Sequence, residues 1–346
     1  MAVKLIRILS SCGLVLLFVL VSCPGPDLVP DPADGVDPAI RAAEGESRAG
    51  RVRPGPEGEE ALFGGVAAEG KSGDFMIYNR LVRFVIQDAY RSHGYVESGG
   101  NIIDVDLVRP PGVPGRDPLD DFFLSFGLAW LFHADSVAVT ADGSDGGPAR
   151  VTAQGSWVLW DFIQGAVEET QPLLPETTFA IVNEYELAPE SWTLKVTSSF
   201  TNEGFEEVQI NPATGYLASQ EDLWAWAAGQ GLNPEDLDGV EAIGGVGRLG
   251  EATLSVWPES GTLPLLALAS LVSSAGISAT SFGWTDVAPG ASIAVVRYVT
   301  PALDTLTAED IEEVSDLALL TEEDVLALDG MEPAHARLLL HAAKDP

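Results

Sequence analysis

The chain has 346 residues, of which 52 are acidic and 18 basic, and its formal net charge is −34. A surface this acidic repels nucleic acid and anionic lipid headgroups, so we expect no nucleic-acid partner. Both cysteines, Cys12 and Cys23, stand near the N-terminus. The length is enough to bury one large core or two smaller ones.

The N-terminus has the parts of a secretory signal. Lys4 and Arg7 form a basic region, residues 8–21 form an apolar core, and that core ends in the run Leu20-Val21-Ser22-Cys23. The core is shorter than the ~20 residues that a membrane-spanning helix needs. The segment resembles the signal peptide and lipobox of bacterial lipoproteins, in which the chain is cut before the cysteine.

This resemblance implies a lipid anchor. Residues 1–22 would be removed as the signal peptide and Cys23 would be acylated, so the membrane becomes a partner of the mature chain. Loss of Cys12 and acylation of Cys23 leave no thiol for a disulfide, a zinc site or a nucleophile. Pro24 follows the cysteine in place of aspartate, which favours the outer membrane or cell surface over the inner membrane. We therefore expect an envelope protein that is anchored to the membrane without spanning it.

Residues 23–70 are rich in Pro, Gly, Asp, Glu and Arg, with a single aromatic residue, Phe63. No sustained apolar periodicity is present, which predicts a disordered tether. The run at residues 31–38 loosely resembles acidic calcium-binding repeats. One short copy is more typical of a solvated linker, because calcium needs about 6–8 converging oxygen ligands.

From residue 71 the sequence is typical of strands. Residues 75–87 are dense in β-branched and aromatic side chains, and residues 101–108 alternate, with Asp104 and Asp106 opposite the apolar positions. Residues 121–132 are too apolar for a half-exposed strand, so we predict a fully buried core segment there.

Hairpin signals then follow in series. Residues 136–155 contain an Asp/Gly turn, residues 179–210 contain turns at Pro189-Glu190 and Asn202–Gly204, and Pro289-Gly290 marks a later turn. No alternation of strand and helix appears, so the fold class is predicted to be mainly β. Residues 71–302 should form one antiparallel β-sandwich or supersandwich. Its inward faces are expected to include Leu81, Val85, Ile103, Val105, Leu107, Leu194, Val196 and Phe200.

Several ordered motifs in residues 71–300 carry a second resemblance. The series GDFMIYNRLVRFVIQ, GGNIIDVDLV, DGSDGGPARV, NEYELAPESWTLKVTSSFTNEG and VAPGASIAVVRY resembles the N-terminal β-rich region of large secreted myxobacterial proteins. That region often precedes a PHP-type metallohydrolase domain. The pair EYELAPES and LKVTSSFTNEG is also similar to the supersandwich of galactose-mutarotase-like, carbohydrate-handling domains.

The positions of the histidines show which catalytic activities of these families the sequence could support. A PHP-type site needs a His-x-His pair, and His93, His133, His335 and His341 do not form one, so the hydrolase half is absent from this sequence. Mutarotase-like catalysis would need a histidine beside a carboxylate as acid and base. Only His93 and His133 lie in the β-rich region, and an ordinary loop or core role is the favoured interpretation of each.

Two acidic stretches are candidate ligand sites. Asp142 and Asp145 could contribute to a calcium loop, although a hairpin turn uses the same residue types for its backbone geometry and is favoured. Calcium is therefore the one candidate cofactor, and no other is expected. The Gly-rich run at residues 242–250 lacks the lysine of a phosphate-binding loop and is interpreted as a mobile loop.

Aromatic residues give the candidate for a sugar site. Trp224 and Trp226 could form a stacking platform beside Glu221 and Asp222, whereas core packing is the commoner role of tryptophan. These four residues are the candidate ligand-binding set.

Residues 303–346 shift to a helical period. Two segments begin with threonine and glutamate in a capping-box pattern, and Gly330 ends the second. The segment resembles a helix-hairpin-helix or the end of a sterile-alpha-motif domain. Glu332 stands where the phosphate-binding turn would need glycine, so a protein-contact or packing unit is favoured.

These observations favour a non-catalytic binding or structural module that is membrane-anchored and exported, with a glycan or a protein as its partner. We expect it not to be an enzyme, because no catalytic constellation is recognisable. The alternatives are a mutarotase-like or metal-dependent carbohydrate-active enzyme, or the accessory domain of a PHP-type hydrolase.

Overall fold

The computed structural model describes a β-rich domain within residues 34–301. The described residues are 34–39, 41–65, 67–90, 96, 98–109, 113–115, 117, 119–126, 130–160, 179–218, 223–227, 231–232, 243–247, 253–258 and 277–301. The predicted signal peptide, including Cys23, and the predicted C-terminal helices at 303–346 lie outside these residues. No helix within the described part of the chain is long and apolar enough to cross a membrane.

The domain is built almost wholly of strands. The first half contains β1 (Ser47–Arg51), α1 (Pro56–Ala61), β2 (Phe75–Asn79), β3 (Val82–Ile86), β4 (Ile102–Leu107), β5 (Leu119–Phe126), β6 (Trp130–Ala141) and β7 (Ala149–Leu159). The second half contains β8 (Phe179–Leu187), β9 (Leu194–Asn202), β10 (Val208–Ile210), β11 (Pro212–Ala218), β12 (Leu223–Ala227), β13 (Gly231–Leu232), β14 (Ile243–Gly247), β15 (Thr253–Pro258), β16 (Ile277–Ser281), β17 (Thr285–Val287) and β18 (Ser292–Thr300).

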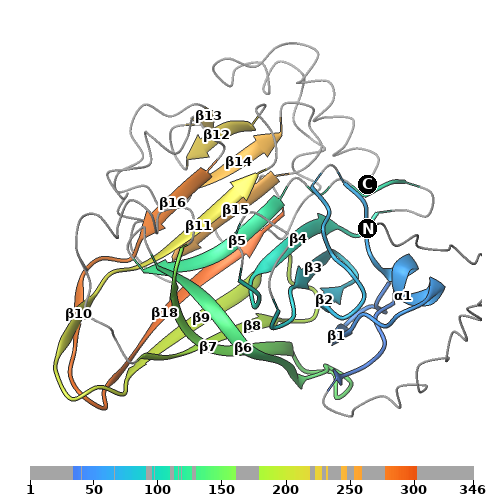
Figure 1. Ribbon diagram of the computed structural model, residues 1–346. Helices are drawn as coiled ribbons and strands as arrows, with labels where there is room; N and C mark the ends of the chain where they lie inside the picture. The colour runs from blue at the N-terminus through green and yellow to red at the C-terminus, as the bar shows by residue number, and fades with distance from the viewer. Residues whose placement is uncertain are drawn as a thin grey trace, which may run out of the picture. The chain divides into compact units, whose positions relative to one another are not determined.

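The large sheet has the order β1-β2-β3-β4-β5-β6-β7-β8-β9-β18-β15-β14-β12-β13, and β11 joins it through β5 and carries β16 (Figure 1). Its named strands pair antiparallel throughout. The predicted fold class, mainly β and antiparallel, is therefore confirmed.

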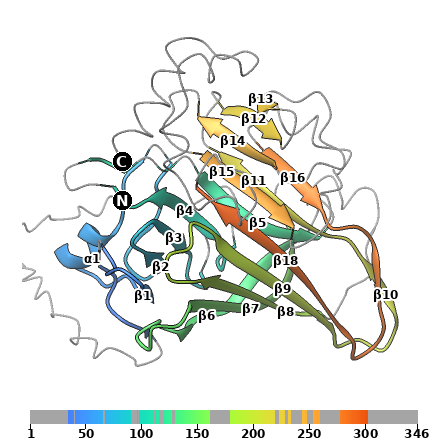
Figure 2. The same cartoon turned by 180° about the vertical axis from the view of Figure 1, so that it is seen from behind.

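The sheet turns a corner at β5. A single pair, Ile102 with Phe122, joins β5 to β4, and only Ser125 and Phe126 join it to β6. Along most of its length β5 pairs with β11 instead. Figures 1 and 2 show β5 and β11 lying over β18, so the sheet folds back on itself as a sandwich.

The main core lies between these layers, and β8 and β9 show how the sequence produces it. Both strands alternate strictly between buried and half-buried positions over nine residues, because successive side chains of a strand point to opposite faces of the sheet. The inward positions Leu194, Val196 and Phe200 are fully buried, as predicted. The turn at Pro189-Glu190 that joins the two strands is also confirmed, with Glu190 at a positive φ of 59°.

The prediction of a disordered tether up to residue 70 is wrong for its second half. Residues 47–51 form β1, which pairs with β2, and residues 56–61 form α1. Val52 and Phe63 belong to a second core cluster. The sequence does not predict this strand because small residues, which give no strand signal, are needed where two backbones approach closely. A Cβ on Gly50 would lie 1.5 Å from the carbonyl oxygen of Val36.

The faces of β4 also differ from the prediction. Asp104 and Asp106 are fully buried rather than solvent-facing. A register shift against β3 between Val85 and Ile86 places Ile103 in the second cluster, whereas Val105 packs in the main core. The single inward face expected for Ile103 and Val105 is therefore wrong, because an irregular strand does not keep period two.

Candidate functional site

A short ribbon links the two layers of the sandwich. β9 continues through a turn into β10 and then β11, while β16 continues into β17 and then β18, and β10 pairs with β17. The β9–β18 pair and the β11–β16 pair are thus joined by the β10–β17 ribbon, at one side of the domain in Figures 1 and 2.

The Asn202 side chain anchors this ribbon. Its amide donates to the backbone oxygens of Glu206 and Val287, at 2.8 and 2.9 Å. Its carbonyl oxygen accepts the N–H of Gly204 at 2.9 Å, which confirms the predicted turn at Asn202–Gly204. One buried asparagine therefore holds both strands at the start of the ribbon.

Two exposed aromatic side chains mark the ends of the ribbon. Phe205, in the turn before β10, is 100% exposed, and Trp284, just before β17, is 61% exposed. Leaving large apolar faces in water is unfavourable, so exposed aromatic residues commonly mark binding surfaces. The carboxylates of Glu206, in the turn before β10, and Asp286, on β17, are also exposed, and Asp286 Oδ1 accepts a hydrogen bond from Gln209 at 3.0 Å. Aromatic faces beside hydrogen-bond acceptors are the chemistry that suits a sugar ring.

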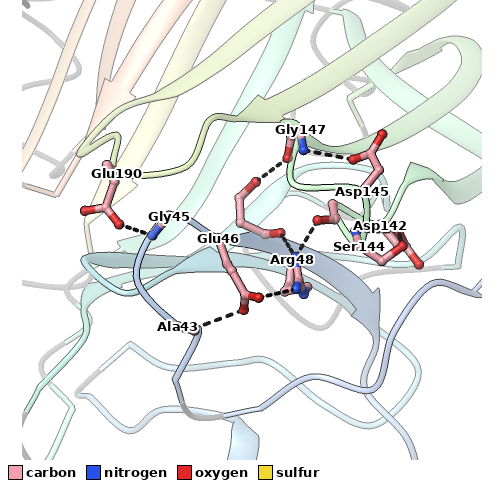
Figure 3. Close-up of polar contacts among 11 residues, drawn as sticks. Ala43, Gly45, Glu46, Arg48, Asp142, Ser144, Asp145, Gly147 and Glu190 are labelled. Atoms are coloured by element: carbon pink, nitrogen blue, oxygen red, sulfur yellow. Dashed lines mark hydrogen bonds and ion pairs between the residues drawn. The ribbon is translucent and has the colours of Figure 1, made fainter.

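The turn that carries Asp142 and Asp145 has a local structural role. Asp142 Oδ1 accepts hydrogen bonds from the N–H and hydroxyl of Ser144, at 2.9 and 2.6 Å, and these hold the pKa of its carboxyl below the usual value. Asp145 Oδ1 accepts the N–H of Gly147 at 2.8 Å. Both carboxylates thus close their own turn, as the favoured interpretation expects (Figure 3).

Residues of β1 fasten the same turn to the sheet. The Arg48 guanidinium donates to the backbone oxygen of Gly143 and pairs with Glu46 at 2.7 Å. The Ser47 hydroxyl donates to the backbone oxygen of Gly147 at 3.1 Å. Figure 3 shows Arg48 lying between Glu46 and the turn. Within the described ranges, no three His, Cys, Asp or Glu side chains gather as a metal site would require.

The sandwich interior contains a polar network around Arg297. The Arg297 Nη1 donates to the hydroxyl of Ser198 at 2.7 Å, and Ser198 donates to the Asn183 carbonyl oxygen. The neighbouring Tyr185 hydroxyl donates to the backbone oxygen of Gly100 at 2.6 Å. These side chains lie on β18, β9 and β8, so the network crosses three adjacent strands.

The remaining predicted site residues are not brought together in the described part of the chain. His133 lies within β6, opposite Ser156 of β7, while His93 lies outside the described residues. Trp224 and Trp226 occupy β12, and their side chains are not among those described. Their predicted neighbours Glu221 and Asp222 also fall outside.

Sequence reasoning missed the exposed aromatic residues and Arg297. For Arg297 a signal exists, since it stands in phase with Val295 and Val299 in an alternating strand, and period two places it on the inward face. For Phe205 and Trp284 no such signal exists, because their exposure depends on the ribbon.

Neither a family model nor a curated protein matches the chain. Its fold is similar to solved structures described as galactose mutarotase-like or aldose 1-epimerase proteins. A galactose mutarotase related enzyme from Lactobacillus acidophilus has a TM-score of 0.38 and 11% identity, covering 66% of this chain and 97% of that one. A putative aldose 1-epimerase from Klebsiella pneumoniae has a TM-score of 0.40 and 10% identity, covering 71% and 84%.

Proposed function

We propose that this chain is a lipid-anchored protein of the cell envelope that binds a carbohydrate without transforming it. The observation that carries the proposal is the exposure of Trp284 and Phe205 on the β10–β17 ribbon, a part of the fold that buried hydrogen bonds of Asn202 hold in place. An aromatic side chain that is held in one position binds a sugar ring at a small cost in conformational entropy.

The non-catalytic part of the proposal is supported by the surroundings of His133. Proton exchange with a sugar needs a histidine held by a carboxylate within hydrogen-bond reach. No described carboxylate forms an ion pair with His133, the fourth residue of the 12-residue strand β6. The envelope location rests on the run that ends at Cys23.

The test is glycan-array binding of the detergent-solubilised lipidated chain, followed by titration of any glycan that binds. We expect Trp284→Ala and Phe205→Ala each to weaken binding about tenfold, roughly 1.4 kcal/mol. Val113→Ala is the matched control, because Val113 is also exposed, at 42%, but lies outside the ribbon. Trp224→Ala and Trp226→Ala test the predicted platform in the same assay.

Two outcomes would contradict the proposal. Glycan binding that survives both ribbon substitutions would place the site elsewhere. Turnover of a free sugar anomer by the chain, lost in His133→Ala, would replace a binding function with a mutarotase-like one.

A further inference from the structure

Arg297 is a fully buried cation in the middle of the sandwich. Its side chain is 1% exposed, and on β18 the residue pairs with Val196 of β9. The guanidinium carbon lies 5.6 Å from the ring centroid of Phe122, which belongs to β5 in the opposite layer. The positive charge therefore sits between the two layers, away from solvent.

The described groups around this charge are neutral. Nη1 bonds the Ser198 hydroxyl, the Phe122 ring faces the guanidinium, and Tyr185 is the one group that raises the Arg297 pKa. Burial outweighs this effect and lowers the pKa of Arg297 to about 10, so the side chain remains protonated at neutral pH. The Nε atom is buried and has no hydrogen-bond acceptor among the described residues.

Arg83, the other buried arginine among the described residues, has the neighbouring carboxylates that Arg297 lacks within the described part of the chain. Arg83 also lies in the interior, but the charges of Asp106 and Asp104 both act on it. Burying an ion is costly unless a counter-charge accompanies it. Arg297 has the cost of burial without a described carboxylate to offset it.

A second polar atom in the same interior also lacks a partner. Thr214 of β11 is fully buried and its hydroxyl has no hydrogen-bond partner among the described residues. Thr214 pairs with Leu124 of β5, and paired residues of antiparallel strands lie on the same face of the sheet. Phe122 is two residues from Leu124 and therefore shares this face. Thr214 thus lies on the face of β5 and β11 from which Phe122 contacts Arg297. A hydroxyl can donate as well as accept.

We propose that Arg297 holds a compact monovalent anion inside the sandwich, a carboxylate or a halide that accepts a hydrogen bond from Nε. The Thr214 hydroxyl would supply the second donor. A single guanidinium matches one negative charge, and carboxylates bind arginine through such N–H groups. The acidic surface of the chain opposes entry of anions, so binding should need millimolar concentrations.

The experiment is thermal unfolding of the full mature chain at constant ionic strength, with sodium chloride, acetate or glucuronate exchanged for a bulky sulfonate buffer salt. A ligand that binds only the folded state raises the Tm by a saturable amount, about 5 °C at 100 times the dissociation constant. Glucose is the neutral comparison for glucuronate. The chloride and acetate arms separate a halide site from a carboxylate site.

Arg297→Met should abolish the anion-dependent rise in Tm, and Thr214→Val should weaken it severalfold. Arg150→Met is the matched control, since Arg150 lies in the same sheet but pairs with Glu186 and should leave the rise intact. A flat Tm, or an equal rise in Arg297→Met, would overturn the proposal.

If Arg297→Met does not fold, the proposal is tested on the wild-type chain by the broadening of the chloride-35 NMR line, with acetate as the competing anion. Absence of broadening together with a flat acetate titration would overturn the proposal. Because Trp284 lies on the ribbon, Trp284→Ala should keep the anion dependence, which separates this proposal from that of the glycan site.

Discussion

The carboxyl groups of Asp104, on β4, and Asp117 interact with each other, and both side chains are fully buried. Asp104 also accepts the backbone N–H groups of Glu69 and Gly70, at 2.7 and 2.9 Å. Burial raises the pKa of Asp104 to about 7 and that of Asp117 well above its usual value. Both carboxyl groups are therefore protonated at acidic pH, and because the charge of Asp104 raises the pKa of Asp117, Asp104 releases its proton first.

The raised pKa of Asp104 predicts that the chain is less stable in alkali. An unfolded aspartate releases its proton near pH 4, whereas the folded Asp104 holds its proton to about pH 7. The contribution to the free energy of unfolding is thus complete below about pH 4 and is lost as pH rises through 7. Urea unfolding at pH 5 and pH 8.5 should show a decrease on the order of 2 kcal/mol.

Asp117→Asn and Asp104→Asn test which carboxyl group of the pair is the cause. Asp117 Oδ1 accepts the N–H groups of Val105 and Leu119, and an asparagine can keep both bonds while donating its amide to Asp104. The variant mimics the protonated Asp117 and leaves Asp104 buried, so it should keep most of the decrease between pH 5 and 8.5, whereas Asp104→Asn, which removes the group that titrates there, should lose it. Asp145→Asn, in an exposed turn, should behave as the wild type does. An unchanged pH dependence in Asp104→Asn would refute the assignment.

A second prediction concerns β1, whose residues the sequence pattern predicts to be part of a disordered tether. Gly50→Ala should lower the free energy of unfolding by about 1–3 kcal/mol, because the new Cβ would meet the backbone oxygen of Val36 and the strand must shift. Gly64→Ala is the control, since no atom lies within 4 Å of its added Cβ. Equal urea midpoints for the two variants would contradict the folding of residues 47–51 onto the sheet.

The contrast between β8 and β1 shows which parts of the fold are predictable from sequence. β8 could be predicted because it is rich in aromatic and β-branched residues, ends in the alternating run Glu184–Leu187 and is followed by a turn of suitable residues. β1 carries its contacts through Ala49 and Gly50, whose small size gives no hydrophobic signal. The burial of Asp104 could not be predicted, because a charged side chain in a strand ordinarily faces water.

The candidate site was less predictable than the fold. The exposure of Phe205 follows from long-range pairing between β10 and β17, which are 75 or more residues apart along the chain and have no local pairing signal. The role of Asp142 and Asp145 in their turn could be predicted, since Asp and Gly at that spacing favour such hydrogen bonds.

A third prediction follows from the run that ends at Cys23. Cys23→Ala should lose metabolically incorporated fatty acid and leave the membrane fraction, because acyl chains rather than a spanning helix hold the chain there. Cys12→Ala is the control, since that residue would be removed with the signal. Unchanged partitioning of Cys23→Ala into the detergent phase would rule out the lipid anchor.

The last prediction tests whether Asn202 positions the ribbon. Asn202→Ala removes the bonds to Glu206, Val287 and Gly204. The backbone oxygen of Val287, which is buried, loses this partner, so the free energy of unfolding should fall by about 2 kcal/mol. Because the substitution changes neither aromatic side chain, a loss of glycan affinity would show that binding depends on the position of Phe205. Thr201→Ala is the neighbouring control, as the Thr201 hydroxyl bonds Ser292 at an exposed position. Full glycan affinity in a folded Asn202→Ala chain would show that the ribbon need not be fixed for binding.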